Sequence, residues 1–373
     1  MAFSDILKLK KEEQKKEETI FVRDLIVGSD IFTVLLVKKM APEHKDSFKI
    51  LSEAKLTLEN IQNLGPYTIR GEANIKAIKS EFNLDDSAPV HSEFYKEMKF
   101  HKFHSRTKPM TLLEGEEFYT HSHIKAEEAG LLDLTMSDVE RVNECLIENR
   151  ISSVEKLDST ELIDKKNWAI HCTNGLIIEC ENLYWGESPY QLYHLLSNKS
   201  VFDNETVEYL ESTKTPLALY VNFNFENVVI DKEETIFFPL SFTHEWGHFI
   251  GDVSNVDEEN VKQVARFVTF VNKEESTEED ISKKIRLLKK NIEKNFESFK
   301  GENYSEQVVL TENSPCSKID DSMLSEDELK KKSLTFFSYN APLFAKNEDD
   351  DNSADSCDSL SYFARGYFAH KNI

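Results

Sequence analysis

The sequence predicts an α+β protein: a mostly helical N-terminal region, then a domain with a small sheet, one functional helix and C-terminal helices. Apolar residues recur at helical spacing through much of residues 43–100. Short runs rich in β-branched residues, separated by turn residues, follow from residue 168. We therefore expect an N-terminal α+β region of unknown role over residues 1–165 and a second domain over residues 166–373.

The composition indicates a globular protein that avoids nucleic acid. Of 373 residues, 39% are hydrophobic and 11% are aromatic, which is enough for a substantial core. The formal net charge of -23 would repel nucleic acid and anionic membrane surfaces, and it is compatible with a basic substrate. No stretch approaches the roughly 20 apolar residues that span a bilayer, so we expect no membrane insertion.

Cysteine usage and the N-terminus bear on the compartment. The five cysteines are odd in number and widely spaced, without a C-x-x-C pair, so they predict neither a disulfide framework nor a cysteine zinc site. Residues 1–18 lack the basic and apolar regions of a Sec signal peptide. We expect the chain to work in a reducing cytosol.

Local signals predict the elements of the first half. Two runs rich in β-branched residues, 19–27 and 31–37, flank Gly28-Ser29-Asp30 and are interpreted as a hairpin. Helical spacing predicts helices over residues 43–63, 72–82, 92–100 and 137–149.

The next elements alternate between strands and helices. Asn174-Gly175 predicts a hairpin between strands 168–172 and 176–180. Helices are predicted at 189–196 and 205–212, and strands at 217–223, 228–230 and 234–238.

One motif dominates the functional reading. Residues 244–248 read H-E-x-x-H, the signature of a zinc site on a helix, and Pro239 and Gly251 suit the ends of a short helix over 239–250. His244 and His248 would then share one helix face and bind one zinc ion. Glu245 would take the proton of a zinc-bound water. The second domain is therefore expected to be a zincin-like metallopeptidase domain.

Helical elements are expected after the motif. Residues 260–272 have helical spacing, and a capping box at Ser276-Thr277-Glu278-Glu279 opens a long helix with an apolar stripe from Ile281 to Phe299. The acidic stretch 347–358 is predicted to be an exposed loop, and residues 359–370 are predicted to be helical.

A catalytic zinc needs a third protein ligand. The longer motif with a third histidine fails, because position 254 is a serine. The open alternatives are an acid on a later helix or an acid soon after the motif, namely Asp252, Asp257, Glu258 or Glu259.

Residues 244–252 resemble the zinc helix of metallopeptidases of the anthrax lethal factor type, to which the Pro-Pro endopeptidases are related. In that family a C-terminal helix supplies the third ligand, and a Tyr shortly before it stabilises the oxyanion. Residues 361–368 are similar in outline to that helix, and Tyr339 would correspond to the Tyr.

The chain departs from the family pattern at two positions, since Ser361 and Arg365 stand where the helix has acids. Arg365 has no lone pair for zinc. Either the register differs, or a nearby acid substitutes, or the site is degenerate. Asp358, three residues before Ser361, would lie on the same face of an extended helix and is the candidate third ligand.

These residues predict a zinc endopeptidase that cleaves a protein or peptide substrate. Zn2+ would be held by His244, His248 and Asp358, with Glu245 as general base and Tyr339 at the oxyanion. The resemblance implies a bacterial effector or toxin that reaches a host cytosol without a Sec signal; otherwise the chain is cytoplasmic. The alternatives are a non-catalytic interaction protein with a vestigial zinc helix, and a zinc hydrolase with a non-peptide substrate.

Overall fold

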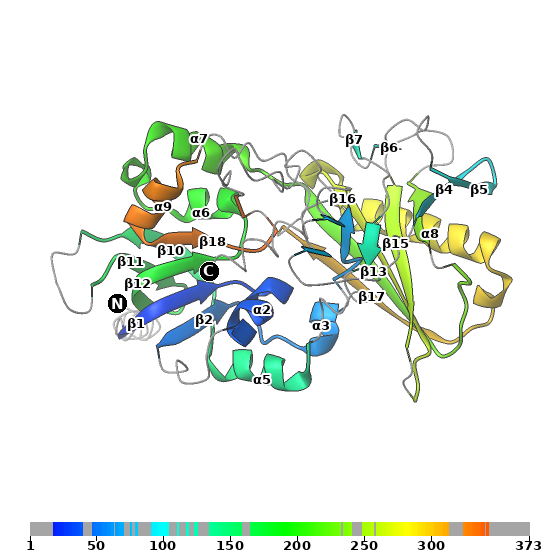
Figure 1. Cartoon of the computed structure of the whole chain (residues 1–373), viewed down its shortest axis with the longest axis horizontal. Coiled ribbons are helices and arrows are strands. Elements are labelled where there is room, and N and C mark those ends of the chain that lie inside the picture. Colours follow the sequence, from blue (N-terminus) through cyan, green and yellow to red (C-terminus); the bar gives the residue numbers. More distant parts are fainter. Residues whose placement is uncertain are drawn as a thin grey trace, which may run out of the picture.

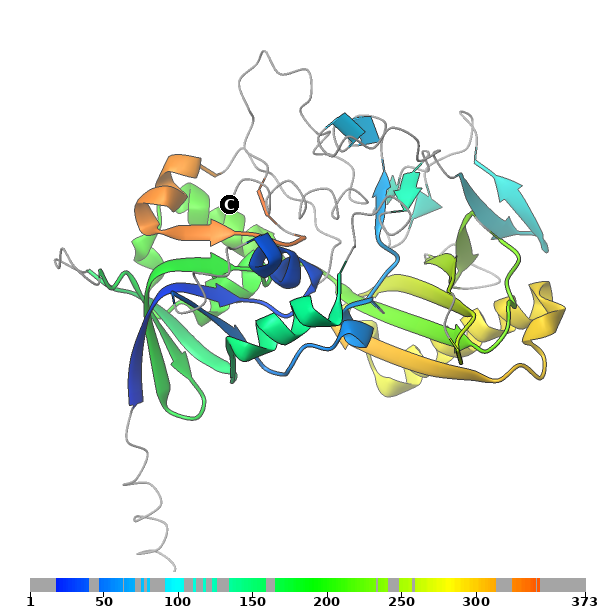
Figure 2. The ribbon, with the colours of Figure 1, turned by 60° about the horizontal axis from the view of Figure 1, so that its bottom comes forward.

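The structure is a computed structural model that describes residues 18–39, 47–62, 64–70, 75–76, 79–80, 91–103, 110–111, 117–118, 123–125, 134–158, 165–232, 234–240, 248–256, 259–312, 324–339 and 341–342. These residues form two lobes, each built on a seven-stranded sheet (Figure 1). Figure 2 shows the same lobes from another side, with the first sheet and its helices on the left.

The first sheet is mostly parallel. Its strands are β1 (Glu18–Val27), β2 (Phe48–Ser52), β9 (Leu146–Glu148), β10 (Ile151–Lys156), β11 (Trp168–Cys172), β12 (Leu176–Trp185) and β18 (Leu334–Phe336). The order is β10-β11-β12-β1-β2-β9, and β18 pairs with the second half of β12. β18, β12, β1, β2 and β9 are parallel, whereas β10 and β11 are antiparallel to their neighbours. Such a sheet needs crossover connections and cover on both faces.

Helices supply that cover and make three layers. α2 (Ile31–Lys39) and α5 (Met136–Glu144) pack on one face; α6 (Pro189–Leu195), α7 (Asn204–Ser212) and α9 (Glu326–Lys332) pack on the other (Figure 1). Every residue of α2 from Ile31 to Val37 is buried. A helix that is apolar all round belongs to the interior of a large domain.

The hairpin predicted at residues 19–37 is wrong, because a helix follows β1. β1 pairs in parallel with β12 on one side and with β2 on the other, so no place remains beside it for residues 31–37 as a strand. The apolar run has neither strand alternation nor a polar helical face, and burial on all sides explains why the sequence pattern was ambiguous.

Local signals in the middle of the chain are confirmed. Asn174 and Gly175 join β11 to β12, and Gly175 has a φ of 94°, which suits glycine. α6 and α7 match the predicted helices closely. The helix predicted over residues 137–149 is confirmed only in its first part, as α5, because residues 146–148 form β9. The N-cap of α5 is Thr135, which forms a capping box with Asp138.

The second sheet has the order β17-β13-β16-β15-β14-β4-β5. Its strands are β4 (Ser92–Lys96), β5 (Lys99–Lys102), β13 (Leu217–Phe225), β14 (Thr235–Pro239), β15 (His248–Asn255), β16 (Gln263–Val271) and β17 (Tyr304–Thr311). All its pairings are antiparallel except that of β14 with β4. The long predicted helix is confirmed as α8 (Glu278–Asn295), which packs Leu288 and Ile292 against the sheet. Its N-cap is Thr277.

Small elements complete the described part of the chain. They are α3 (Leu58–Gln62), β3 (Thr68–Arg70), β6 (Met110–Thr111), β7 (Glu117–Phe118), β8 (His123–Lys125), and the 3-10 turns η2 (Lys199–Val201), η3 (Lys273–Glu275) and η4 (Glu297–Phe299). No helix within the described ranges is long and apolar enough to cross a membrane.

The predicted fold class is wrong, because the protein is rich in sheet and is not a helical region followed by a zincin-like domain. Phe48–Ser52 and Ser92–Lys96 are strands within ranges predicted as helices, and β16 replaces the helix predicted at 260–272. Strands from both sides of the predicted boundary at residues 165 and 166 share the first sheet.

Candidate functional site

The carboxyl ends of the parallel strands lie at one edge of the first sheet, toward the second lobe (Figure 1). The chain leaves β1 for β2 on one side, whereas β12 takes the other side of β1, so the connection order reverses between β1 and β12. Open α/β sheets bind ligands at such a switch point. Gly28, Ser29 and Asp30 follow β1 there, and Gly186 and Glu187 follow β12.

Backbone hydrogen bonds hold three chain segments together at this edge. The amide of Gly186 donates to the carbonyl of Val27 at 2.7 Å, and the amide of Phe337 donates to the carbonyl of Trp185 at 3.1 Å. The ends of β1, β12 and β18 therefore converge. We define the switch-point cluster as Ser29, Asp30, Glu187, Phe337 and Ser338.

Asp30 is almost fully buried, with 3% of its surface exposed. Its Oδ1 accepts hydrogen bonds from the amide of Thr33 at 3.1 Å and from the Thr33 hydroxyl at 3.3 Å, at the start of α2. The hydroxyl of Ser338 donates a short hydrogen bond to Oδ2. Burial raises the pKa of Asp30 to about 6, although the hydrogen bonds from Ser338 and Thr33 act in the opposite direction.

Glu187 is half-buried and lies close enough to Asp30 for the negative charge of Asp30 to affect its pKa. Burial, and then the negative charge of Asp30, raise the pKa of Glu187 to about 7, while a hydrogen bond from Ser29 lowers it. That bond joins the Ser29 hydroxyl to Oε1 at 3.4 Å. Glu53 follows β2 at the same edge, is exposed, and lies 3.5 Å from Nε of Arg150. Three strand ends thus bring three carboxyl groups to one edge.

The ring of Phe337 fills the space over two glycines of the site. A Cβ on Gly186 would overlap this ring. A Cβ on Gly28 would lie 3.3 Å from the ring and 2.6 Å from the Thr33 hydroxyl. The two glycines therefore make room for side chains of the protein itself.

The helix predicted over residues 239–250 is wrong. Pro239 ends β14 and His248 begins β15, and the two residues pair across an antiparallel ladder. His244 and Glu245 lie outside the described residues. His248 itself stands on an extended strand and not on the predicted helix.

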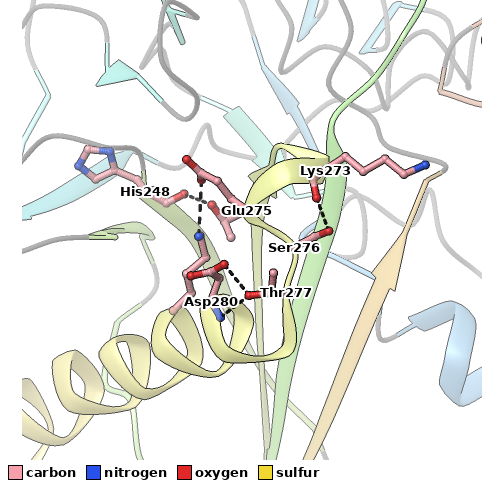
Figure 3. A network of polar contacts seen from close by, with 8 residues as sticks. His248, Lys273, Glu275, Ser276, Thr277 and Asp280 are labelled. Atoms are coloured by element: carbon pink, nitrogen blue, oxygen red, sulfur yellow. Dashed lines mark hydrogen bonds and ion pairs between the residues drawn. The ribbon is translucent and has the colours of Figure 1, made fainter.

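The described neighbours of His248 do not form a metal centre. Its carbonyl accepts a hydrogen bond from the Thr269 hydroxyl at 2.9 Å, and Figure 3 shows its ring directed away from the polar network at the start of α8. In that network Asp280 bonds Thr277, and Glu275 forms an ion pair. Among the described residues, no group of three or more His, Cys, Asp or Glu side chains could hold a metal.

Tyr339 lies in the first lobe, whereas His248 belongs to the second sheet. Tyr339 is buried and packs edge-on against Phe32 of α2, with ring centroids 5.0 Å apart. Asp358 lies outside the described residues. The structure therefore places Tyr339 beside Ser338 of the switch-point cluster and not with His248.

Sequence reasoning missed the switch-point cluster. The sequence of Gly28-Ser29-Asp30 predicts a hairpin turn, because these residue types favour turns. The available signal was Glu53, about 25 residues after Gly28, since an acid follows the second strand at a similar spacing in dinucleotide-binding units. Ser338 carried no such signal, because it is 308 positions from Asp30.

A parallel sheet with helices on both faces, entered through β1–α2–β2 and with its edge at a switch point, defines the doubly wound class of α/β domains. Here that domain is joined to a second, largely antiparallel sheet.

No protein-family model and no curated protein matches the sequence. Solved structures do match. An oxidoreductase from Methanosarcina mazei has a TM-score of 0.53 and 8% identity, over 94% of this chain and 100% of that one. A putrescine oxidase with redesigned cofactor binding has a TM-score of 0.51 and 9% sequence identity, over 95% of this chain and 99% of that one. Cyclohexylamine oxidase from Brevibacterium oxydans has a TM-score of 0.50 and 8% sequence identity, over 94% of this chain and 98% of that one. At these identities the likeness shows the fold alone, which this chain shares with these solved oxidoreductases.

These findings correct the functional predictions. The resemblance to zinc metallopeptidases, the zinc cofactor, and the assignments as a peptide hydrolase and toxin are wrong, because the fold is the one found in these solved oxidoreductases and not a zincin fold. The non-catalytic alternative with a vestigial zinc helix is not supported either.

The residues at the switch point do not fit the dinucleotide that this fold implies. A pyrophosphate binds the free amides at the N-terminus of the helix after the first strand. At α2, the amide of Thr33 already donates to Asp30, and Phe337 covers the glycines. A carboxylate there would repel phosphate, so we assign no chemical step to a flavin.

Proposed function

We propose that this protein binds an organic amine at the carboxyl edge of the first sheet. The observation that carries the proposal is the pair of carboxyl groups at the switch point, Asp30 and Glu187, whose pKa values are raised to about 6 and about 7. A positive charge beside Glu187 would relieve the repulsion between the two acids and replace the solvation that Glu187 loses by burial.

The chemistry of the edge selects against anions and for cations. Glu187 is the less buried of the two acids of the cluster, and the buried Asp30 lies close enough for its negative charge to raise the pKa of Glu187. The chain as a whole carries a net charge of -23, which raises the local concentration of cations. An ammonium group can donate hydrogen bonds to Glu187, as a pyrophosphate cannot.

Two of the structural neighbours support an amine in particular. Putrescine oxidase, also solved bound to putrescine, and cyclohexylamine oxidase act on amines according to their names, and both cover nearly the whole of this chain. The likeness is one of fold, so it supports the class of ligand and not a particular amine.

Calorimetric titration of the full chain with putrescine and with cyclohexylamine tests the proposal. We expect binding at pH 8 that Glu187→Gln weakens about tenfold to a hundredfold, because a charge-assisted hydrogen bond is lost. Binding should weaken below pH 7, where Glu187 takes up a proton.

The matched control is Glu279→Gln, which removes an exposed acid on α8 in the other lobe. It should leave the affinity unchanged at physiological salt. Butanediol and cyclohexanol, the uncharged counterparts, should not bind. Equal affinities of Glu187→Gln and Glu279→Gln for both amines would remove the proposal.

Flavin-dependent oxidation is the competing candidate function, although the contacts of Asp30 and Phe337 at the switch point oppose a bound dinucleotide. Two residues favour it: Gly28 stands at the first glycine position of a dinucleotide-binding pattern, and Glu53 follows β2 at the position of the ribose-binding acid. Flavin released from the purified chain on denaturation would favour this candidate over cofactor-free amine binding.

A further inference from the structure

We infer that Asp30 occupies the place of a dinucleotide's pyrophosphate, so that this chain folds and works without FAD or NAD bound there. The inference rests on the contacts of the switch-point cluster and not on the amine proposal. Three observations carry it: the pattern of residues after β1, the hydrogen bonds of Asp30, and the position of Phe337 and Ser338, which follow β18, at the site.

The pattern after β1 departs from a dinucleotide site at two of three glycines. Aligned on Gly28, the G-x-G-x-x-G pattern places Asp30 at its second glycine and Thr33 at its third. The second glycine lets the pyrophosphate approach the backbone, and the third lets the helix pack closely on the strand. In this chain the Asp30 side chain occupies the position of the second glycine, and the Thr33 side chain occupies that of the third.

The Asp30 carboxylate makes the kind of contact that a phosphate makes in such a fold. It accepts from the amide of Thr33 at 3.1 Å, at the N-terminus of α2, where the helix dipole favours negative charge. The hydroxyls of Thr33 and Ser338 also donate hydrogen bonds to it. The chain thus supplies its own anion at the helix N-terminus.

The segment that follows β18 covers the site. Phe337 and Ser338 directly follow β18, and the Phe337 amide is fixed on the carbonyl of Trp185 at 3.1 Å. From there the Phe337 ring covers Gly28 and Gly186. A dinucleotide would have to displace both this ring and the bond between Ser338 and Asp30.

Spectroscopy on the full chain tests the inference without any variant. We expect no flavin absorbance after denaturation of the purified protein, and no rise in the unfolding midpoint when FAD or NAD is added. Flavin retained at one molecule per chain, or a dinucleotide-dependent rise in the midpoint, would overturn the inference.

Asp30→Gly provides a second measurement. Removing the carboxylate restores the second glycine, and we expect FAD to bind this variant at least tenfold more tightly than it binds the wild type, by flavin fluorescence. Equal FAD affinities in the two proteins would also overturn the inference, and the wild-type measurement decides the matter if the variant does not fold. Neither readout depends on amine binding, so the two proposals fail separately.

Discussion

The surroundings of Asp30 act on its charged form in two opposite ways. The N-terminus of α2 and the hydrogen bonds from Thr33 and Ser338 favour its charged form. Burial disfavours that form more strongly, which is why its pKa rises to about 6 from an ordinary value of 3.8. Near neutral pH the protein therefore carries a buried charge that weakens the folded state.

The pH dependence of stability follows from this pKa. The folded state binds the proton of Asp30 more tightly than the unfolded state, so this contribution is fully present below pH 3.8 and is lost as the pH rises through about 6. We expect Asp30→Asn to raise the unfolding free energy at pH 8 by about 2 to 3 kcal/mol. The gain should fade toward pH 4. Urea unfolding at both pH values measures it.

Asp203→Asn is the matched control, because Asp203 caps α7 with a pKa that the hydrogen bonds from Thr206 lower. Its contribution is present at high pH and is lost as the pH falls, so this variant should lose stability at pH 8. A loss of stability in Asp30→Asn at pH 8 would show that the Asp30 charge helps the fold.

At the scale of the element, β15 explains why the zinc motif misled. The sequence predicts a helix over residues 239–250, because Pro239 and Gly251 suit helix ends and the histidines are four positions apart. In the structure, Pro239 and His248 belong to neighbouring strands, because β14 and β15 pair from Ile236 with Gly251 to Pro239 with His248. Pairing with β16 on the other side then fixes β15 as an interior strand.

The variant Gly251→Ala distinguishes a strand from a helix at this position. In β15 a Cβ at this position would overlap the ring of Phe267, so we expect a loss of about 1 to 3 kcal/mol in unfolding free energy. At the end of an exposed helix the same change would be mild or favourable. Thermal or urea unfolding measures the difference.

Ser282→Ala, on the exposed side of α8, is the control for a helical site. It should change the unfolding free energy by no more than about 0.5 kcal/mol, since alanine is the better helix former. A gain of stability in Gly251→Ala would support the helix and contradict the strand.

At the scale of the whole molecule, charge is the dominant feature. The 68 acidic residues outnumber the 45 basic ones, and the negative carboxyl edge of the first sheet is one part of this imbalance. Self-repulsion of so large a net charge opposes the compact state, and dissolved salt screens it.

We therefore expect salt to stabilise the protein. Raising sodium chloride from about 0.02 M to about 0.5 M should raise the unfolding midpoint by a few degrees. Asp30→Asn should show the same slope, because a buried charge is screened little. A midpoint that falls with salt would mean that favourable ion pairs outweigh the repulsion.

The sequence by itself determined the elements whose signals are local. Asn174-Gly175 defined the β11–β12 hairpin, and polar and apolar faces defined α5, α7 and α8, since each of these elements keeps one side toward water. Only the tertiary structure decided the nature of α2 and β16. Both are buried on all sides, and complete burial removes the alternation from which a helix and a strand are told apart. The switch-point cluster also depended on the tertiary structure, because Asp30 and Ser338 meet only when β18 pairs with β12.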